Sequence, residues 1–309
     1  MLNQINYGII GAGHLGTYHA QQLQNIKNVS LVGVFDINKQ NSKKISNKHK
    51  IKTFNSPNEL FSACNAVSIT TPASNHFESA MLAMQNNCHV FIEKPITHNV
   101  LEASKLIQYK KARKLKMQIG HIERFNPAFI ALLKTKPRPR FIESHRLCAF
   151  NNRGLDVDVI LDLMIHDIDL LSMLIPSPIK TINAYGASVL TNSIDMANAR
   201  IEFKTGETAN LTASRISLKQ MRQMRVFQKN SYSVVDLQNQ TLNTWKVDSH
   251  KKLQSSNETI IASNALFEEL NHFIYSIQHD LLEKVRPEEA FEALKIASKI
   301  QKKIAKKQQ

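Results

Sequence analysis

The segment 161–171, LDLMIHDIDLL, sets three polar side chains among apolar ones at a spacing that suits chemistry. Asp162, His166 and Asp169 stand at positions i, i+4 and i+7, so on an α-helix they share one face. Two carboxylates and an imidazole can transfer protons, bind a metal ion, or satisfy one another inside a core. Asp167 falls off this face, and we expect no catalytic role for it.

A glycine-rich stretch near the N-terminus has the context of a dinucleotide-binding loop. An apolar run leads into Gly11-x-Gly13-x-x-Gly16, and a helical pattern follows. In such a loop the first glycine makes the tight turn, the second lets the backbone approach a pyrophosphate, and the third lets helix and strand pack closely. The phosphates would lie at the helix N-terminus. A plain glycine turn is the alternative interpretation.

The next apolar run, SLVGVFDIN, favours the nucleotide interpretation because it ends in Asp36, 20 residues after Gly16. A carboxylate at this strand end accepts hydrogen bonds from ribose hydroxyls and repels a 2'-phosphate. Neither Ile37 nor Asn38 supplies the arginine that a phosphate would need. We therefore expect NAD rather than NADP.

A further apolar run, CHVFIEKPIT, ends in Glu93-Lys94-Pro95. The proline ends regular strand pairing, and Lys94 stands at the carboxyl end of the strand, where open α/β sheets bind ligands. A lysine near a nicotinamide can donate to a substrate hydroxyl or take part in proton transfer. In isolation, an exposed lysine at a strand end is the simpler interpretation.

Apolar runs that alternate with helical patterns predict a parallel, doubly wound sheet in the first part of the chain. After residue 140, strands follow one another with short turns, which favours an antiparallel sheet. A chain of 309 residues is long enough for two domains. No uninterrupted apolar run of about 18 residues occurs, so we expect no membrane span.

The net charge of +15 comes mainly from two segments. Residues 101–140 hold 11 Lys and Arg against 2 Glu, and residues 295–309 hold 6 Lys and no acidic residue. No zinc-finger spacing or RNA-binding signature accompanies them, so we expect an anionic small molecule rather than nucleic acid as the partner. The N-terminus lacks the features of a signal peptide. Three cysteines at unrelated spacings suggest reduced thiols in a cytoplasmic protein.

In order and spacing, these motifs resemble those of the glucose–fructose oxidoreductase / inositol dehydrogenase / MocA (Gfo/Idh/MocA) family of nicotinamide-dependent dehydrogenases. The matching stretches are GIIGAGHLGTYHAQQL, VSITTPASNHFESAMLAM, HVFIEKPIT, Asp162-x-x-x-His166 and ALFEELNHFIYSI. The resemblance implies a Rossmann domain, placed at residues 1–122, and an α+β domain with a large, mostly antiparallel open sheet, placed at 123–309. The C-terminal helices can pack back on the first domain. Because that sheet commonly makes subunit contacts in the family, we expect a homo-oligomer, dimer or tetramer.

The same resemblance assigns roles to residues. His166 would be the general base for a sugar hydroxyl, Asp162 would orient the base or the hydroxyl, and Lys94 would polarise the developing carbonyl oxygen. Expected substrate contacts are these three with His121, Glu123, Arg124 and Arg153. Expected cofactor contacts are Gly11, Gly13, His14, Leu15, Gly16, Asp36, Thr71, Pro72, His76, Glu93 and Lys94. No metal site is expected, and Asp169 is interpreted as a supporting or structural hydrogen-bonding group.

The stretches GHIERFNPA, DVDVILDLMIHDIDLL and SRISLKQMRQMRVF resemble the branch of the family that includes UDP-N-acetylglucosamine 3-dehydrogenases. That branch implies oxidation of the 3-hydroxyl of a UDP-linked N-acetylamino sugar; a free sugar, inositol or other polyol is the alternative substrate. Candidate diphosphate contacts are Arg146, Arg153, Arg215, Arg222 and Arg225, and the sequence does not choose among them.

Two hypotheses from other classes were weighed against a dehydrogenase. A metal-dependent hydrolase or lyase could use Asp162, His166 and Asp169, but it would leave the glycine loop without a role. A non-catalytic NAD or ligand sensor would not need Lys94 and His166, which form a proton-transfer set.

Overall fold

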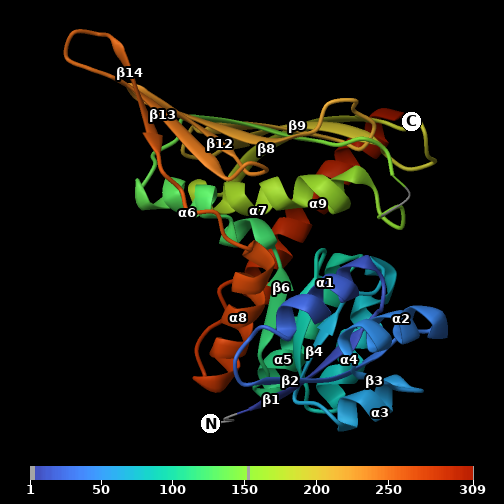
Figure 1. Ribbon diagram of the computed structural model, residues 1–309. Coiled ribbons are helices and arrows are strands. Elements are labelled where there is room, and N and C mark those ends of the chain that lie inside the picture. Colours follow the sequence, from blue (N-terminus) through green and yellow to red (C-terminus); the bar gives the residue numbers. More distant parts are fainter. Residues whose placement is uncertain (1–3, 152–153, 309) are drawn as a thin grey trace. The chain divides into compact units, whose positions relative to one another are not determined.

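The computed structural model describes residues 4–151 and 154–308 (Figure 1). Arg153, one of the expected substrate contacts, lies outside these residues. The chain forms two compact units, the first made of Met1–His121 and Leu266–Glu292, the second of Ile122–Ala265 and Ala293–Gln309. The chain therefore enters the second unit at Ile122, next to the expected boundary, and then returns to the first unit for one segment.

The first unit contains the expected parallel, doubly wound sheet. Six strands of the described chain pair in the order β3-β2-β1-β4-β5-β6, and every neighbouring pair is parallel. The strands are β1 (Ile5–Ile10), β2 (Val29–Phe35), β3 (Lys52–Thr53), β4 (Ala66–Ile69), β5 (His89–Glu93) and β6 (Met117–Gly120). The connecting helices are α1 (His14–Leu23), α2 (Lys39–His49), α3 (Pro57–Ser62), η1 (Ala73–Asn75), α4 (His76–Gln85) and α5 (Val100–Arg113).

Helix α8 (Ala265–Gln278) returns to the first unit because its apolar face completes that unit's core. Its buried residues Leu270, Phe273 and Ile274 pack with the strand residues Tyr7 and Phe91. The Phe273 ring meets the other two aromatic rings edge-on, at centroid distances of 6.4 Å and 5.8 Å. The helix is thus held by buried apolar area.

The second unit contains the expected large, mostly antiparallel sheet. Eight strands of the described residues pair in the order β14-β13-β12-β11-β7-β10-β9-β8, and of these pairs β7 and β10 are parallel. The strands are β7 (Phe141–Leu147), β8 (Ile179–Ala187), β9 (Met196–Phe203), β10 (Thr208–Ser214), β11 (Met221–Gln228), β12 (Ser231–Asp236), β13 (Thr241–Val247) and β14 (Leu253–Glu258). The helical segments are η2 (Ile122–Phe125), α6 (Pro127–Lys134), η3 (Ile160–Met164), α7 (Ile165–Leu174) and α9 (Pro287–Gln308), whose first residues belong to the first unit.

Helices α6 and α7 lie along one face of this sheet (Figure 1). Strand residues alternate accordingly: Ile142, Ser144 and Arg146 of β7 are buried, whereas Phe141 and Glu143 on the other face are partly exposed. The helix-covered face carries the segment 161–171.

That segment is not one regular α-helix, which corrects the expectation. Residues Ile160–Met164 form a π-helical turn, η3, and the α-helix begins at Ile165. Asp162 therefore lies in the π-helical turn and His166 in the first turn of α7. Such turns carry an extra residue and occur often at functional sites. Asp158 helps to start the segment, because its Oδ1 accepts hydrogen bonds from the backbone N–H groups of Ile160 and Leu161.

Candidate active site

The glycine loop of the first unit has the geometry that its motif predicts. Gly11 has a φ of +96°, and a Cβ there would lie 2.7 Å from the carbonyl carbon of Thr70. A Cβ on Gly16 would overlap the carbonyl oxygen of Gly11. A Cβ on Gly13, in contrast, would meet no described atom within 4 Å. Gly11 and Gly16 are thus needed by the fold, while Gly13 borders open space that a pyrophosphate could occupy.

The N-terminus of helix α1 has neither a side-chain cap nor an acidic residue. Helices α2, α3, α5 and α6 begin with side-chain caps from Asn38, Ser56, Asn99 and Asn126. Helix α1 begins after Gly13 with no side-chain cap and no acidic residue in its first turn. Its first N–H groups and the positive end of its dipole can therefore receive an anion. The loop fits the diphosphate of a dinucleotide.

Asp36, at the end of β2, is tied to the glycine loop. Its carboxylate accepts a hydrogen bond from the N–H of Ala12 at 2.5 Å and from the N–H of Asn38 at 2.7 Å. The carboxylate is therefore fixed beside the loop, where its remaining lone pairs can accept from ribose hydroxyls. The adjacent Ile37 is almost fully exposed and offers no positive charge.

The strand that ends in Lys94 is anchored by a buried polar chain. His19 Nε2 lies 2.9 Å from Glu93 Oε1, His19 Nδ1 lies 2.9 Å from Ser68 Oγ, and Ser68 Oγ lies 3.0 Å from the hydroxyl of Tyr7. Burial raises the pKa of the Glu93 carboxyl, but the bond to His19 and nearby positive charges outweigh burial and hold this pKa below its ordinary value. Glu93 is thus an ionised anchor within the protein, and its neighbour Lys94 is partly exposed.

The loop after β4 is joined to the segment after Lys94 by His76. Its Nδ1 lies 2.7 Å from the carbonyl oxygen of Pro95, and its Nε2 lies 2.9 Å from the carbonyl oxygen of Thr71. A ring can donate both bonds only when both nitrogens carry protons. The hydroxyl of Thr71 is buried and has no hydrogen-bond partner among the described residues, so it is available to a bound cofactor. Thr70, which no sequence motif singles out, secures this loop by donating from its hydroxyl to the carbonyl oxygen of Gly11 at 2.7 Å.

In the second unit, Arg146 of β7 holds Asp167 of α7. Its Nε and Nη2 donate to the two carboxylate oxygens of Asp167 at 3.1 Å and 2.9 Å, and its Nη1 donates to Glu123 at 2.7 Å. All three side chains are buried. Burial lowers the pKa of Arg146, but the two carboxylates outweigh this effect and raise it above its ordinary value. These three side chains thereby connect β7, η2 and α7.

A second ion pair fixes the same helix from the other side. Arg124 Nε and Nη2 donate to the two carboxylate oxygens of Asp169 at 2.7 Å and 2.6 Å. Asp169 is therefore a structural partner, in agreement with its expected role, and both of its oxygens are committed. A metal site that used Asp169 would have to break this pair.

Asp162 and His166 remain the groups suited to chemistry on this helix. Asp162 is partly exposed and His166 is 9% exposed. A Cβ on Gly154, whose φ is +65°, would lie 3.0 Å from a carboxylate oxygen of Asp162. Gly154 thus lies against the Asp162 carboxylate, at a φ that favours glycine.

The expected contacts are distributed unevenly between the two units. The glycine loop, Asp36, Thr71, His76 and Lys94 gather at the carboxyl ends of β1, β2, β4 and β5. His121, the last residue of the first unit, is buried. The charges of Glu123 and Arg124 are paired with Arg146 and Asp169, so neither side chain is proposed as a substrate ligand. The sequence around Glu123 and Arg124 does not show that both charges are paired within the protein, because their partners are distant in the chain.

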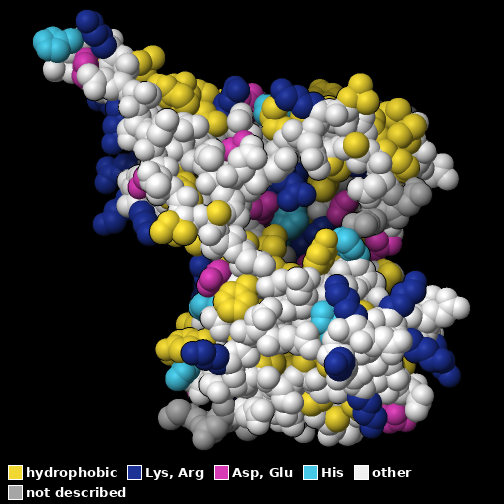
Figure 2. Space-filling model, viewed as in Figure 1, with side chains coloured by type: hydrophobic (Ala, Val, Ile, Leu, Met, Phe, Trp, Pro, Cys, Tyr) yellow, Lys and Arg dark blue, Asp and Glu magenta, His cyan; other side chains and the backbone are white. Residues whose placement is uncertain are grey.

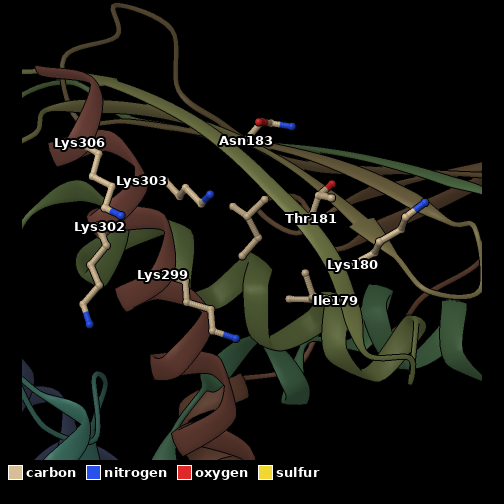
Figure 3. A pocket seen from close by; sticks show the side chains of 9 residues that line it. Ile179, Lys180, Thr181, Asn183, Lys299, Lys302, Lys303 and Lys306 are labelled. Atoms are coloured by element: carbon tan, nitrogen blue, oxygen red, sulfur yellow. The ribbon is translucent and has the colours of Figure 1, made fainter.

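A separate groove in the second unit has a volume of about 540 Å³. It is lined by Ile179, Lys180, Thr181, Ile182, Asn183, Lys299, Lys302, Lys303 and Lys306, and Figure 3 shows Lys303 extending from α9 toward β8. No carboxylate belongs to this lining, and none of the expected catalytic residues does. Figure 2 shows Lys and Arg outnumbering Asp and Glu on the visible face, in line with the net charge of +15.

Two further properties concern the described residues as a whole. No group of three His, Cys, Asp or Glu side chains there is arranged to hold a metal ion. None of the helices in that part of the chain is long and apolar enough to cross a membrane.

Known proteins match both units. A family model described as an oxidoreductase family with an NAD-binding Rossmann fold matches residues 5–121, and a GFO/IDH/MocA C-terminal domain matches residues 139–231. UDP-N-acetylglucosamine 3-dehydrogenase of Acidithiobacillus ferrooxidans is 41% identical over 239 residues, which cover 77% of this chain and 76% of that protein. A solved structure of UDP-N-acetylglucosamine 3-dehydrogenase from the same organism has a TM-score of 0.92 and 35% identity, covering 97% of this chain and 98% of that one. The scyllo-inositol 2-dehydrogenase (NAD(+)) of Bacillus subtilis is 27% identical over 240 residues, which cover 70% of this chain and 69% of that protein.

Proposed function

Because the chain belongs to the Gfo/Idh/MocA family of oxidoreductases, we propose that it oxidises the 3-hydroxyl of a UDP-linked N-acetylamino sugar with NAD. The observation that carries the proposal is that Asp162 of η3 leads directly to His166 of α7, a helix that two buried ion pairs hold in place. A helix fixed in this way presents a proton-transfer pair with defined geometry. The relative named for UDP-N-acetylglucosamine supports the substrate class.

When bound, the nicotinamide supplies the acceptor for a hydride. His166 takes the proton of the sugar hydroxyl, because an imidazole exchanges protons near neutral pH. Asp162, earlier on the same helical segment, orients the imidazole or the hydroxyl. Lys94 stabilises negative charge on the developing carbonyl oxygen. The buried Glu93–His19 pair beneath Lys94 fixes the strand end from which this lysine extends.

The proposed cofactor is NAD rather than NADP. Gly11, Gly13, Gly16 and α1 would hold the diphosphate, and Asp36 would accept from the adenosine ribose. A 2'-phosphate would meet the Asp36 carboxylate, which is already fixed by two N–H groups, with no arginine among the next two residues. NADP should therefore bind more weakly.

The test is reduction of NAD, followed by absorbance, with UDP-N-acetylglucosamine, other UDP-sugars, free sugars and inositols. We expect turnover with UDP-N-acetylglucosamine and NAD. Lys94→Ala and His166→Ala should fold and bind NAD but lose about 100-fold or more of the turnover rate, while Lys246→Ala, an exposed lysine of β13, should behave as wild type. Wild-type rates in both site variants would contradict the assigned roles.

We also propose that the protein is a cytoplasmic homo-oligomer that uses the sheet face opposite α6 and α7. On this face Phe141, Phe227, Tyr232 and Trp245 form a row across four adjacent strands, at centroid distances of 5.7 Å, 5.6 Å and 4.6 Å; the first pair is tilted and the other two are stacked. All four side chains are only partly buried, and exposed aromatic side chains of this kind are typical of subunit interfaces. Light scattering should give the mass of a dimer or tetramer, and Tyr232→Glu should shift the protein toward monomer.

The cytoplasmic location is supported by the three cysteines, which are free thiols, as suits a reducing compartment.

A further inference from the structure

Three arginines lie at the same end of three adjacent strands in the second unit. Arg146 of β7 pairs directly with Arg222 of β11 and with Ala213 of β10. Arg215 follows Ala213 by two residues, so its side chain leaves the chain on the same side. This is the sheet face that carries the helix with Asp162 and His166, because Arg146 itself bonds to that helix.

The charges of these arginines are not equally compensated. Arg146 is surrounded by the carboxylates of Asp167 and Glu123. Arg215 is 4% exposed and donates from Nη2 to the carbonyl oxygen of Val157 at 2.8 Å. Its Nε and Nη1 have no hydrogen-bond partner among the residues that the structure describes. A buried cation whose donors are unused is costly unless an anion compensates it.

Arg222 adds an accessible donor next to this buried charge. It is exposed, and within the described ranges it makes no ion pair with a carboxylate. The fourth candidate, Arg225, lies on the opposite face and pairs with Glu143 at 3.3 Å. Burial raises the pKa of the Cys148 thiol, Asp162 adds to this rise, and Arg222, Arg215 and Arg146 oppose it. The two uncompensated arginines and Asp162 therefore each lie close enough to Cys148 to act on its thiol.

We propose that Arg215 and Arg222 form the subsite for the diphosphate of a nucleoside-diphosphate sugar, Arg222 as the exposed contact and Arg215 as the buried charge behind it. The inference rests on the proposed function for the identity of the ligand. Among the candidate arginines that the structure describes, it selects Arg215 and Arg222 and assigns to Arg146 a positioning role, since the donors of Arg146 are spent on Asp167 and Glu123. A dianionic group there would offset two positive charges that the described protein leaves unpaired.

The test is calorimetric binding of UDP, with uridine as the uncharged comparison, to full-length protein. Wild type should bind UDP and should not bind uridine measurably. Arg222→Gln and Arg215→Gln should each weaken UDP binding by about 10- to 100-fold. Arg215→Lys keeps the positive charge but has fewer hydrogen-bond donors, so it should lose less UDP affinity than Arg215→Gln. Arg200→Gln, an exposed arginine of β9 on the opposite face, should bind UDP as wild type does. NAD affinity, a property of the first unit, should be unchanged throughout, and a wild-type unfolding transition of the second unit reports that each variant is folded.

UDP affinity unchanged in Arg222→Gln would overturn the proposal, and so would wild type that binds NAD but not UDP. Arg222 is exposed, so its variant keeps the test decisive even if Arg215→Gln fails to fold. Arginine-dependent UDP binding without oxidation of UDP-N-acetylglucosamine would instead contradict the proposed function and leave the subsite standing.

Discussion

Arg124 and Asp169 meet through two parallel hydrogen bonds of 2.7 Å and 2.6 Å, and both side chains are almost completely buried. The pair joins η2, the first segment of the second unit, to α7, which carries His166. Removal of one partner would leave an uncompensated buried charge, and such losses typically cost about 3–5 kcal/mol.

Asp169→Asn should therefore lower the free energy of unfolding by several kcal/mol, measured by urea denaturation of the second unit. Glu143→Gln is the matched control, because it removes the exposed Arg225–Glu143 pair and should cost less than about 1 kcal/mol. Equal effects of the two changes would contradict the structural role of the buried pair.

Replacement by alanine should weaken NAD binding at Gly13 and lower thermal stability at Gly16. Gly13 has a φ of −76° and open space around its Cα, so Gly13→Ala should leave the thermal midpoint unchanged but weaken NAD binding at least about 10-fold. In Gly16→Ala the new methyl overlaps the Gly11 carbonyl, so the midpoint itself should fall. Differential scanning calorimetry and NAD titration distinguish the two. Full NAD affinity in Gly13→Ala would rule out a pyrophosphate at this loop.

His89, at the start of β5, should make stability depend on pH. Burial lowers its pKa to about 4, and the charge of Lys116 adds to the effect. The unfolded chain therefore takes up a proton near pH 6.5 while the folded chain does not, so stability present above pH 6.5 is lost as the pH falls toward 4. The loss is at most about 3 kcal/mol. Unfolding curves between pH 7 and pH 4 for wild type and His89→Gln should show a shallower decline in the variant; parallel curves would contradict the buried neutral histidine.

The lysines of α9 should destabilise their own helix. Lys299 and Lys303, and likewise Lys302 and Lys306, stand at i and i+4, and the groove lining contains no carboxylate. Like charges at this spacing cost about 0.2–0.5 kcal/mol per pair. The quadruple change to Gln should raise the thermal midpoint at low salt, and added NaCl should stabilise wild type more than the variant. An equal salt response would show that the repulsion is negligible.

The sequence predicted most of what short-range pattern can encode. The glycine spacing, Asp36 at a strand end and the Glu93-Lys94-Pro95 strand end each depend on residues close together in the chain, and both sheets are as expected. It could not predict which charges neutralise each other, because Arg146 and Asp167 are 21 residues apart in the sequence and Arg124 and Asp169 are 45 residues apart. These pairings arise only when η2, β7 and α7 pack together.

Two other features also depend on tertiary structure. The π-helical turn at Asp162 leaves the apolar pattern of the segment intact, so periodicity alone predicts an ordinary helix. The family resemblance implies that C-terminal helices can pack back on the first domain, but the sequence of helix α8 does not specify the contact of Phe273 with Tyr7 and Phe91.

Hydride transfer from C3 of a UDP-linked amino sugar can be measured with UDP-N-acetylglucosamine that carries deuterium at C3. The proposed reaction predicts that the deuterium appears in the reduced nicotinamide, raising the mass of NADH by about one unit, and that reduction slows relative to the unlabelled sugar. Unlabelled NADH formed during turnover, or no reduction of NAD with this substrate by protein that binds both ligands, would contradict it.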